Sequence, residues 1–431
     1  MLDDLSCCPN QSAKQSKWKG QRSFRIRAAY SSIQGIPCRK KESSQIQSGI
    51  AKGVTLLSPC IVVSGLYNAT TMNFWQQLEK PFLAVAPMAD VTDAAFRRLI
   101  AKYSEFPGRS DVVMWTEFVA ADGLVRATPE GKEKLMADLI YTDEERPIVA
   151  QLFSSTPEHM EYAAKLCLEL GFDGIDINMG CPDRSIEKQG CGSAMIKTPD
   201  VALEVIAAAK RGAKSEKGGI PVSVKTRLGY LEDEVETWIP TLLRAAPAAL
   251  TIHARTRKDM SKVPARWERI ARVVELRDAL SPDTKIIGNG DVLSQADAAQ
   301  KLAACGADGA MVGRALFGNP WFFHPTKRVP LKLLALPTHG VNRDEIIVAD
   351  KSEVGVKYVS MEERLRVMVE HSYLFAELLP FKSFATMKKH YKAYVHGFPG
   401  AAQLRARLME EGNSPDKVEV VVLDFIAEIN N

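Results

Sequence analysis

IVAQLF (148–153) is followed by PEHMEYAAKLCLEL (157–170) and then by GIDINM (174–179). The first and third segments are short apolar runs, as expected of buried strands. The middle segment follows Thr156, a residue type suited to capping, and has the apolar spacing of an amphipathic helix. Two buried strands separated by a helix predict a parallel pair whose outer face is covered by that helix.

The same alternation extends in both directions along the chain. Six further strand candidates are FLAVAPM (82–88), VVMWTE (112–117), VSVKTR (222–227), ALTIHA (249–254), KIIGNG (285–290) and GAMVGR (309–314). Helix candidates lie between most of them, for example after the potential caps Thr92 and Ser294. Eight such units in roughly 245 residues predict a (β/α)₈ TIM barrel, an α/β fold. An open doubly wound sheet is the competing architecture, but no GxGxxG motif follows any of these strands.

The rest of the chain divides into segments of different character. Residues 1–74 hold ten basic and three acidic residues among many Ser and Gln, and they predict a disordered basic extension. Residues 75–325 hold the predicted barrel, and residues 326–360, with Pro, Gly and mixed charge, predict a connector or insertion. Residues 361–431 contain helical patterns broken at Pro and Gly, so we expect a small C-terminal helical domain.

The composition is that of an ordinary globular chain: 431 residues, 46% hydrophobic and 25% charged, with a formal net charge of +4. Eight cysteines without a Cys-x-x-Cys pair favour reduced thiols inside a cell and predict no metal site. The most apolar early stretch, residues 54–67, is too short to span a membrane. We expect a cytoplasmic protein. The basic extension also suits a mitochondrial transit peptide, although Asp3 and Asp4 count against that alternative.

Polar residues stand at the ends of nearly all predicted strands, which is where a parallel barrel carries its chemistry. They include Glu117, Gln151, Asn178, Cys181, Lys225, Arg227, His253, Arg255, Asn289, Asp291 and Arg314. Each alone has a structural explanation, such as a solvated pair or a small buried side chain, but their gathering at one rim predicts a functional site. The glycine-rich turn 288–291, with Gly313 and Arg314, predicts a phosphate site at the last two strand ends.

Several motifs occur together at a specific spacing. They are APM (86–88) with VTD (91–93), WTEF (115–118), AQLF (150–153), DINMGCP (176–182), GCGSAM (190–195), VKTRLG (224–229), IHARTR (252–257), GNGD (288–291) and VGRALFGNPWFF (312–323). On these motifs the chain resembles the tRNA-dihydrouridine synthases, which are FMN-dependent barrels, and the resemblance continues through FATMKKHYKAY (384–394). It does not extend to residues 1–74 or 326–360.

The resemblance implies an enzyme that reduces the C5–C6 double bond of specific uridines in tRNA. FMN would carry the hydride and NADPH would be the electron donor. Cys181 would be the catalytic acid, because a thiol with an ordinary pKa of ~8.5 is mostly protonated at neutral pH. Cys191 lies close in sequence, but in the following loop and not at the strand end.

The same resemblance implies roles for the other strand-end residues. Lys225 would lie near the N1–O2 edge of FMN, and Gln151 would bind the ring edge. Further cofactor contacts would be Pro87, Met88 and Ala89 at the ring, His253 near the cofactor or its phosphate, and Asn289, Gly290, Asp291, Gly313 and Arg314 around the phosphate. Asn178, Arg227 and Arg255 would contact the uracil edge or the RNA backbone.

A basic segment near the C-terminus indicates an RNA contact independently of the resemblance. Residues 381–407 carry six basic and no acidic residues, with Phe381, Phe384, Tyr391 and Tyr394 among them. Basic side chains contact phosphates and aromatic rings stack on bases, so Lys388, Lys389 and Lys392 are predicted tRNA contacts. A solvated helix face is the alternative interpretation. No stable protein partner is implied.

Two other functions remain open from the sequence. An FMN-dependent oxidoreductase acting on a free pyrimidine or a dihydroorotate-like molecule would share the barrel and the chemistry, but would not need the basic helical segment. A non-catalytic RNA chaperone built on a barrel would bind RNA without flavin. The presence of Cys181, Lys225 and the phosphate motifs argues against that second alternative.

Overall fold

The computed structural model describes residues 73–216, 218–330 and 355–430. The predicted basic extension lies almost wholly outside the described residues, as does most of the predicted connector. At the two described ends of that connector, β11 (Lys327–Arg328) and β12 (Lys357–Tyr358) form a short parallel pair. No helix among the described residues is long and apolar enough to cross a membrane.

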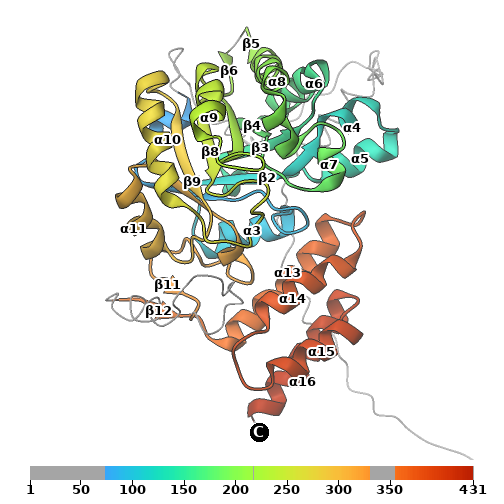
Figure 1. The fold of residues 1–431 in the computed structure, drawn as a ribbon. Coiled ribbons are helices and arrows are strands. Elements are labelled where there is room, and N and C mark those ends of the chain that lie inside the picture. The colour runs from blue at the N-terminus through green and yellow to red at the C-terminus, as the bar shows by residue number, and fades with distance from the viewer. Residues whose placement is uncertain (1–72, 217, 331–354, 431) are drawn as a thin grey trace, which may run out of the picture. The chain divides into compact units, whose positions relative to one another are not determined.

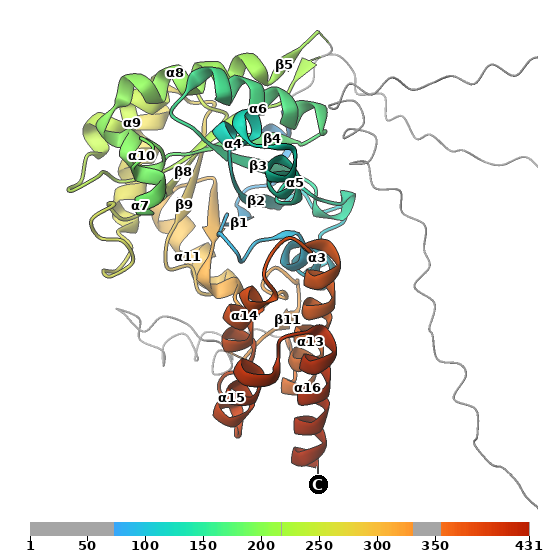
Figure 2. The same ribbon diagram turned by 90° about the vertical axis from the view of Figure 1, so that its right-hand side faces the viewer.

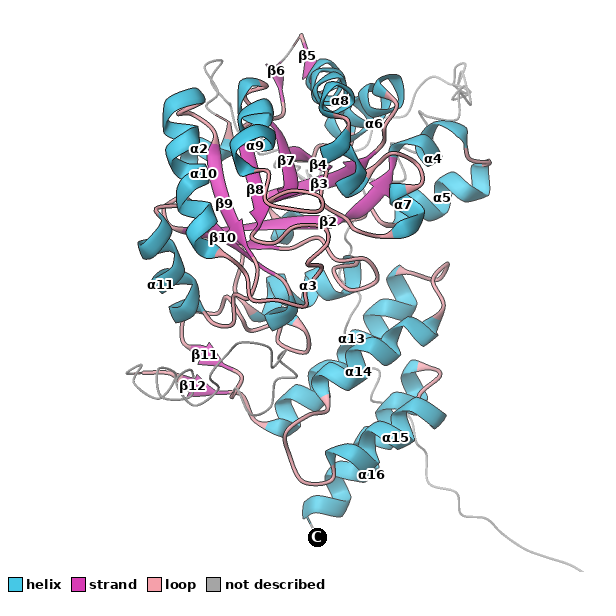
Figure 3. Ribbon diagram, in the orientation of Figure 1, coloured by secondary structure: helices cyan, strands magenta, loops and turns pink. Residues whose placement is uncertain are grey.

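The eight predicted strands form a closed parallel barrel, which confirms the predicted fold class (Figures 1 and 3). Its strands are β1 (Phe82–Val85), β2 (Val112–Ala120), β3 (Ile148–Phe153), β4 (Gly174–Asn178), β7 (Val222–Arg227), β8 (Ala249–His253), β9 (Lys285–Asn289) and β10 (Gly309–Val312). Each strand pairs with the strands before and after it in the barrel sequence, and β1 closes the ring by pairing Val85 with Val312 of β10. A small antiparallel hairpin, β5 (Lys214–Ser215) and β6 (Gly218–Gly219), stands outside this ring.

Helices cover the outside of the barrel, as expected for parallel strands that are buried on both faces. They are α3 (Ala94–Tyr103), α4 (Ala121–Arg126), α5 (Pro129–Ala137), α6 (Pro157–Glu169), α7 (Arg184–Glu187), α8 (Pro199–Gly212), α9 (Val235–Arg244), α10 (Trp267–Leu280) and α11 (Gln295–Cys305), with the short α2 (Phe74–Gln77) before β1.

Only one of the three predicted Ser and Thr caps is made. Ser294 caps α11 by accepting a hydrogen bond from the Asp297 N–H, as predicted. The α3 cap is Asp93, because the Thr92 hydroxyl bonds to the backbone of Met88 instead. Thr156 precedes α6 but makes no capping hydrogen bond.

Strand β2 contains an irregularity that bears on the site. Its pairing with β3 shifts register between Trp115 and Phe118, so the alternation of inward and outward side chains is interrupted at Thr116 and Glu117. The strand also continues to Ala120, beyond the predicted end at residue 117. Phe118 and Glu117 both belong to the strand, but the Phe118 side chain lines the cavity described below and the Glu117 side chain does not.

The C-terminal helices follow the barrel (Figure 2). They are α13 (Met361–Leu378), α14 (Met387–Tyr394), α15 (Ala401–Glu411) and α16 (Pro415–Asn430). Between α13 and α14 the chain forms a 3₁₀ turn at Phe384–Thr386, and α14 starts at Met387. Helix α13 lies beside α3 of the barrel, where Phe96 stacks on His371 with ring centres 5.3 Å apart.

Candidate functional site

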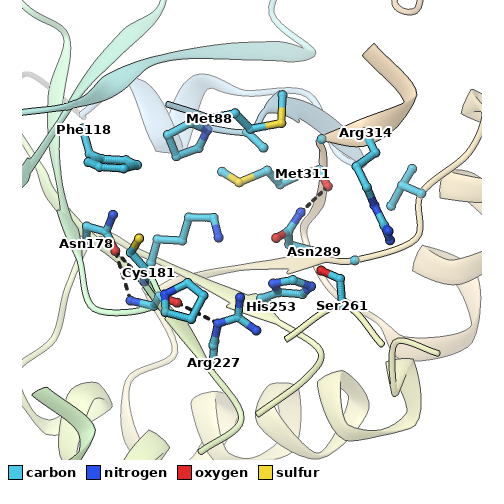
Figure 4. Close-up of a pocket in the computed structure, with 18 of the residues that line it drawn as sticks. Met88, Phe118, Asn178, Cys181, Arg227, His253, Ser261, Asn289, Met311 and Arg314 are labelled. Atoms are coloured by element: carbon cyan, nitrogen blue, oxygen red, sulfur yellow. Dashed lines mark hydrogen bonds between the residues drawn. The ribbon is translucent and has the colours of Figure 1, made fainter. Parts of the chain in front are cut away.

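A cavity of about 260 Å³ lies at the carboxyl ends of the barrel strands (Figure 4). Most of the predicted site residues line it: Pro87, Met88, Gln151, Asn178, Cys181, Lys225, Arg227, His253, Asn289, Gly290, Asp291, Gly313 and Arg314. They meet there because the carboxyl ends of parallel strands share one rim of the barrel. Met88 follows β1 and Gly313 follows β10, and a Cβ added at Gly313 would lie 3.5 Å from the Met88 sulfur.

Five residues with a predicted binding role do not line this cavity, and neither does Glu117 near the end of β2. Ala89 is exposed and follows the two residues of its loop that do line it. Arg255 is buried away from the cavity. Lys388, Lys389 and Lys392 belong to α14. The roles of Ala89 as a flavin contact and of Arg255 as a substrate contact stay predictions.

The cavity also has eight lining residues that were given no role in binding or catalysis from the sequence, although Gly180 and Pro182 belong to the strand-end motif with Cys181. They are Ala86, Phe118, Gly180, Pro182, Ser261, Val292, Leu293 and Met311. Phe118 could have been found by extending β2, since the sequence WTEF continues the apolar run. Ser261 belongs to the long loop after β8, and no local pattern marks that residue as part of a site.

Cys181 is the only one of the four described cysteines that lines the cavity. The loop that carries it is held by Asn178, whose Oδ1 accepts hydrogen bonds from the Gly180 N–H at 3.1 Å and the Cys181 N–H at 2.9 Å. Ser193 donates its hydroxyl to the Cys181 carbonyl at 2.9 Å. Burial raises the pKa of the Cys181 thiol, so the thiol stays protonated at neutral pH.

Cys191 occupies a different environment, although it lies only ten residues further along the chain. Its side chain is buried outside the cavity, and its thiol lies 3.5 Å from the Gln189 carbonyl oxygen. Burial raises its pKa as well. The geometry therefore separates the two thiols by access to the cavity and not by their ionisation.

A chain of hydrogen bonds fixes the amide groups beside Cys181. Asn178 Nδ2 donates to Gln151 Oε1 at 3.2 Å, and Gln151 Nε2 donates to the buried Asp176 at 2.6 Å. The Ser223 hydroxyl also donates to Asp176 at 2.8 Å. An ionised Asp176 can only accept hydrogen bonds, so the Gln151 amide must direct its nitrogen toward Asp176 and its oxygen toward Asn178.

Lys225 brings a buried ammonium group to the same wall of the cavity. It lies on β7 beside Asn178 of β4, with which it is paired in register. Burial lowers the pKa of Lys225 to about 8, helped by the nearby Arg227 guanidinium. A desolvated cation that faces a cavity is an electrostatic site for an anion or for a group that becomes negative.

Arg227 connects the loops on both sides of Lys225. Its Nε donates to the Gly180 carbonyl at 2.6 Å, and its Nη1 donates to the Thr256 and Met260 carbonyls, each at 3.1 Å. Arg227 thereby holds the Cys181 loop against the loop after β8. Figure 4 shows its guanidinium beneath the same cavity wall as Asn178 and Cys181.

The other end of the cavity is organised by Asp291. Its carboxylate accepts the Ala265 N–H at 2.9 Å and pairs with Arg314 at 2.5 Å and with Arg255. Arg255 is further occupied by the Val263 carbonyl at 2.6 Å and by His253 Nε2 at 3.1 Å. Arg255 thus supports Asp291 and His253 from behind, while Arg314 faces the cavity.

His253 and Gly290 complete this end. Burial and the surrounding cations lower the pKa of His253 well below its ordinary value, so its imidazole is neutral at physiological pH. Gly290 has a φ of +122°, and a Cβ there would lie 2.9 Å from the Ala265 Cβ and 3.1 Å from the His253 ring. Only glycine fits that turn, because the positive φ and the close approach of Ala265 and His253 leave no place for a Cβ.

The basic segment is less available to RNA than its sequence suggested. Lys382 pairs with Glu117 at 2.7 Å and with Asp138 at 2.8 Å, and Lys389 pairs with Asp90 at 2.7 Å. Tyr391 and Tyr394 are fully buried, so the prediction that these rings offer stacking surfaces is wrong. Phe381 is exposed, as is Lys392, and Lys388 is half-buried.

These features define a class of protein: a parallel α/β-barrel enzyme whose polar cavity combines a protonated thiol, a buried ammonium group and a turn that carries an arginine. A model of one family, described as dihydrouridine synthase (Dus), matches residues 84–430. The chain belongs to the dihydrouridine synthase family. The resemblance read from the motifs is thereby confirmed.

Curated relatives agree with this assignment. The chain is 37% identical to the probable tRNA-dihydrouridine synthase 2 of Bacillus subtilis (strain 168), over 82% of this chain and 97% of that protein. It is also 37% identical to the probable tRNA-dihydrouridine synthase of Staphylococcus aureus (strain COL), over 78% of this chain and 91% of that protein. A solved histamine dehydrogenase from Rhizobium sp. 4-9 aligns at 13% identity with a TM-score of 0.40, over 68% of this chain and 49% of that one, which is too remote to bear on function.

Proposed function

We propose that this chain reduces the C5–C6 double bond of uridines in tRNA, with FMN as the hydride carrier and NADPH as the electron donor. The observation that carries the proposal is the placing of Cys181 and Lys225 in one cavity at the barrel rim. The relatives described as tRNA-dihydrouridine synthases support tRNA as the substrate.

The residues of the cavity fit FMN. Arg314 faces the cavity and is held by Asp291, which Arg255 supports in turn, and Gly290 and Gly313 bring backbone without side chains to the same end of the cavity, as suits a phosphate group. Pro87 and Met88 offer an apolar wall for the ring system, and Lys225 offers a cation near it. When bound, FMN supplies the hydride that reaches C6 of the uracil.

Cys181 supplies the proton that the reaction also needs. Burial keeps its thiol protonated, so Cys181 can hold that proton until C5 of the uracil accepts it. The Asn178 side chain holds the backbone of the Cys181 loop by two hydrogen bonds, which fixes the position of the thiol. We infer that Asn178 Nδ2 and Arg227 lie beside the uracil.

Lys225 and Gln151 lie on the same wall as Asn178 and would bind the flavin ring. The Lys225 ammonium stabilises negative charge at the ring edge that faces it, and desolvation strengthens that interaction. The Gln151 amide has its donor and acceptor ends fixed by Asp176 and Asn178, so it presents one orientation to the ring. At the Asp291 end of the cavity, the neutral His253 can donate or accept a hydrogen bond to the cofactor without adding positive charge.

The helical residues 361–431 form the RNA-binding part in this proposal. Lys392 is exposed, Lys388 is half-buried, and both lie on α14, which follows the turn that contacts the barrel at Lys382. Phosphate contacts from such lysines hold an RNA backbone without reading its sequence. The base to be reduced would enter the cavity after leaving its stack, as enzymes that act on bases in RNA require.

The test is to release and identify the bound chromophore of the purified full chain and to assay NADPH-dependent formation of dihydrouridine in unmodified tRNA. We expect FMN and tRNA reduction. Reduction of free uracil, or oxidation of a dihydroorotate-like molecule, with tRNA ignored, would favour the small-molecule oxidoreductase. RNA binding by a protein that never binds flavin would favour the RNA chaperone.

A further inference from the structure

Glu117 is a buried carboxylate that the proposed chemistry does not use. It stands near the end of β2, where polar residues were expected to form the site, yet it does not line the cavity. The register shift between Trp115 and Phe118 explains this difference, because a bulge changes the direction of the side chains within it. Phe118 lines the cavity, and its neighbour Glu117 contacts other elements.

The two carboxylate oxygens of Glu117 connect two parts of the chain. Oε1 accepts the Asp90 N–H at 2.5 Å, and Oε2 accepts a hydrogen bond from Lys382 Nζ at 2.7 Å. Lys382 belongs to the turn between α13 and α14, and it also pairs with Asp138 at the end of α5. Burial raises the pKa of Glu117, and the Lys382 ammonium acts against that shift.

The loop that Glu117 holds is the loop that shapes one wall of the cavity. Pro87 and Met88 line the cavity, and Asp90 follows two residues later. Asp90 has a φ of +53°, a left-handed conformation that costs free energy for any residue except glycine. The far end of the loop is fixed by Thr92, whose hydroxyl oxygen accepts the Met88 N–H at 2.8 Å.

We propose that Glu117 is a positioning residue that holds residues 87–90 in the cavity-lining conformation and ties them, through Lys382, to the helical segment. The proposal deepens the proposed function, on which it rests for the identity of the flavin pocket. Glu117 touches neither the cavity nor the reacting atoms, so its effect on the pocket passes through the backbone of Asp90.

Asp138 provides a matched control. Like Glu117, it forms an ion pair with Lys382, at 2.8 Å, and its side chain is mostly buried. Unlike Glu117, it makes no hydrogen bond to the loop at residues 87–90 among the described residues. Glu117→Gln and Asp138→Asn each remove one negative charge from the same lysine, but only Glu117→Gln also weakens the bond to the Asp90 N–H.

The experiment compares these variants with the wild-type full chain in two measurements. Amide hydrogen exchange of peptides covering residues 86–93 reports on the loop without needing flavin, and titration of the apoprotein with FMN by fluorescence quenching reports on the pocket. For Glu117→Gln we expect exchange to quicken by about tenfold or more and the FMN dissociation constant to rise by roughly tenfold, as for removal of a charge-assisted hydrogen bond. For Asp138→Asn we expect both to change less than about threefold.

Equal effects of Glu117→Gln and Asp138→Asn would overturn the proposal, as would quickened exchange with unchanged FMN affinity. If the wild-type protein bound no flavin, the proposed function would fail, while the exchange measurement would still decide whether Glu117 holds the loop. If Glu117→Gln did not fold, Lys382→Gln would replace it. Faster exchange and weaker FMN binding in Lys382→Gln would support the link to the helical segment, and no change in either would overturn it.

Discussion

Lys225 at the barrel rim and Lys382 in the helical segment are both buried, but their surroundings shift their pKa values in opposite directions. Lys225 is buried at the cavity, and burial together with a neighbouring guanidinium lowers its pKa to about 8. Lys382 is also largely buried, but two carboxylates of the barrel surround it and raise its pKa. The Lys225 ammonium faces the cavity, where a ligand can pair with it. The Lys382 ammonium is already paired with Glu117 and Asp138 and joins the helical segment to the barrel. The partners of a cation, and not the number of cations in a segment, therefore decide what it binds.

The largest effect is expected at the rim, from Cys181→Ala. The variant should bind FMN and accept electrons from NADPH, but tRNA reduction should fall by ~10²- to 10⁴-fold, because general acid catalysis is typically worth that much. Single-turnover reduction of tRNA by the prereduced enzyme measures this decrease. Cys191→Ala is the control, since that thiol does not line the cavity. A larger decrease in Cys191→Ala would show that Cys181 is the wrong cysteine for the acid.

A second effect concerns the phosphate end of the cavity. Arg314→Ala combined with Asn289→Ala should raise the FMN dissociation constant by roughly 10- to 100-fold, because the double variant removes both a charged hydrogen-bond donor and part of the cavity wall. Flavin content after gel filtration and titration of the apoprotein both measure it. Full occupancy in the double variant would mean that the phosphate binds elsewhere.

A pH effect should distinguish Lys225 from the paired lysines. The pKa of Lys225 is lowered to about 8, so the side chain is charged below that pH and loses its charge as the pH rises through it. Flavin reduction by NADPH should therefore fall above about pH 8, by up to tenfold per pH unit if only the charged form is active. In Lys225→Arg the fall should move to higher pH, because a guanidinium stays charged. Stopped-flow rates from about pH 6 to about pH 9.5 would show it, and an unshifted profile in Lys225→Arg would exclude Lys225 as the cause.

The smallest effect is expected from Lys388 and Lys392 of α14, which form no ion pair with the barrel among the described residues. Lys388→Gln with Lys392→Gln should weaken tRNA binding and reduce the slope of log affinity against log salt by ~0.7 to 0.9 for each phosphate that is no longer neutralised. Lys389→Gln should change that slope less, because Lys389 is paired with Asp90. Binding isotherms at several salt concentrations provide the test. If both variants kept the wild-type slope, α14 would be a solvated helix face, and the barrel rim would carry the RNA.

The barrel and most residues of its cavity could be predicted from the sequence, because the topology of a parallel barrel brings all strand ends to one rim. Once eight strands alternate with helices, Gln151, Asn178 and Lys225 must meet at one rim, and local patterns suffice to find them. Glu117 and Asp138, the partners of Lys382, lie more than 200 residues earlier, so the charge pattern around Lys382 could not reveal them. The Thr92 cap fails for a different, local reason: its hydroxyl bonds to the backbone of Met88, four residues earlier, which no helix pattern records.

Closure of the barrel between β1 and β10 also sets an order of assembly during synthesis. Met88, on one wall of the cavity, leaves the ribosome early, and Gly313 and Arg314, on the adjoining wall, leave it only after the last barrel strand. A nascent chain that stops before β10 lacks Gly313 and Arg314 and has an unpaired edge at β1. Flavin binding would therefore mark completion of the ring, and by mass action FMN would stabilise only chains that have closed it.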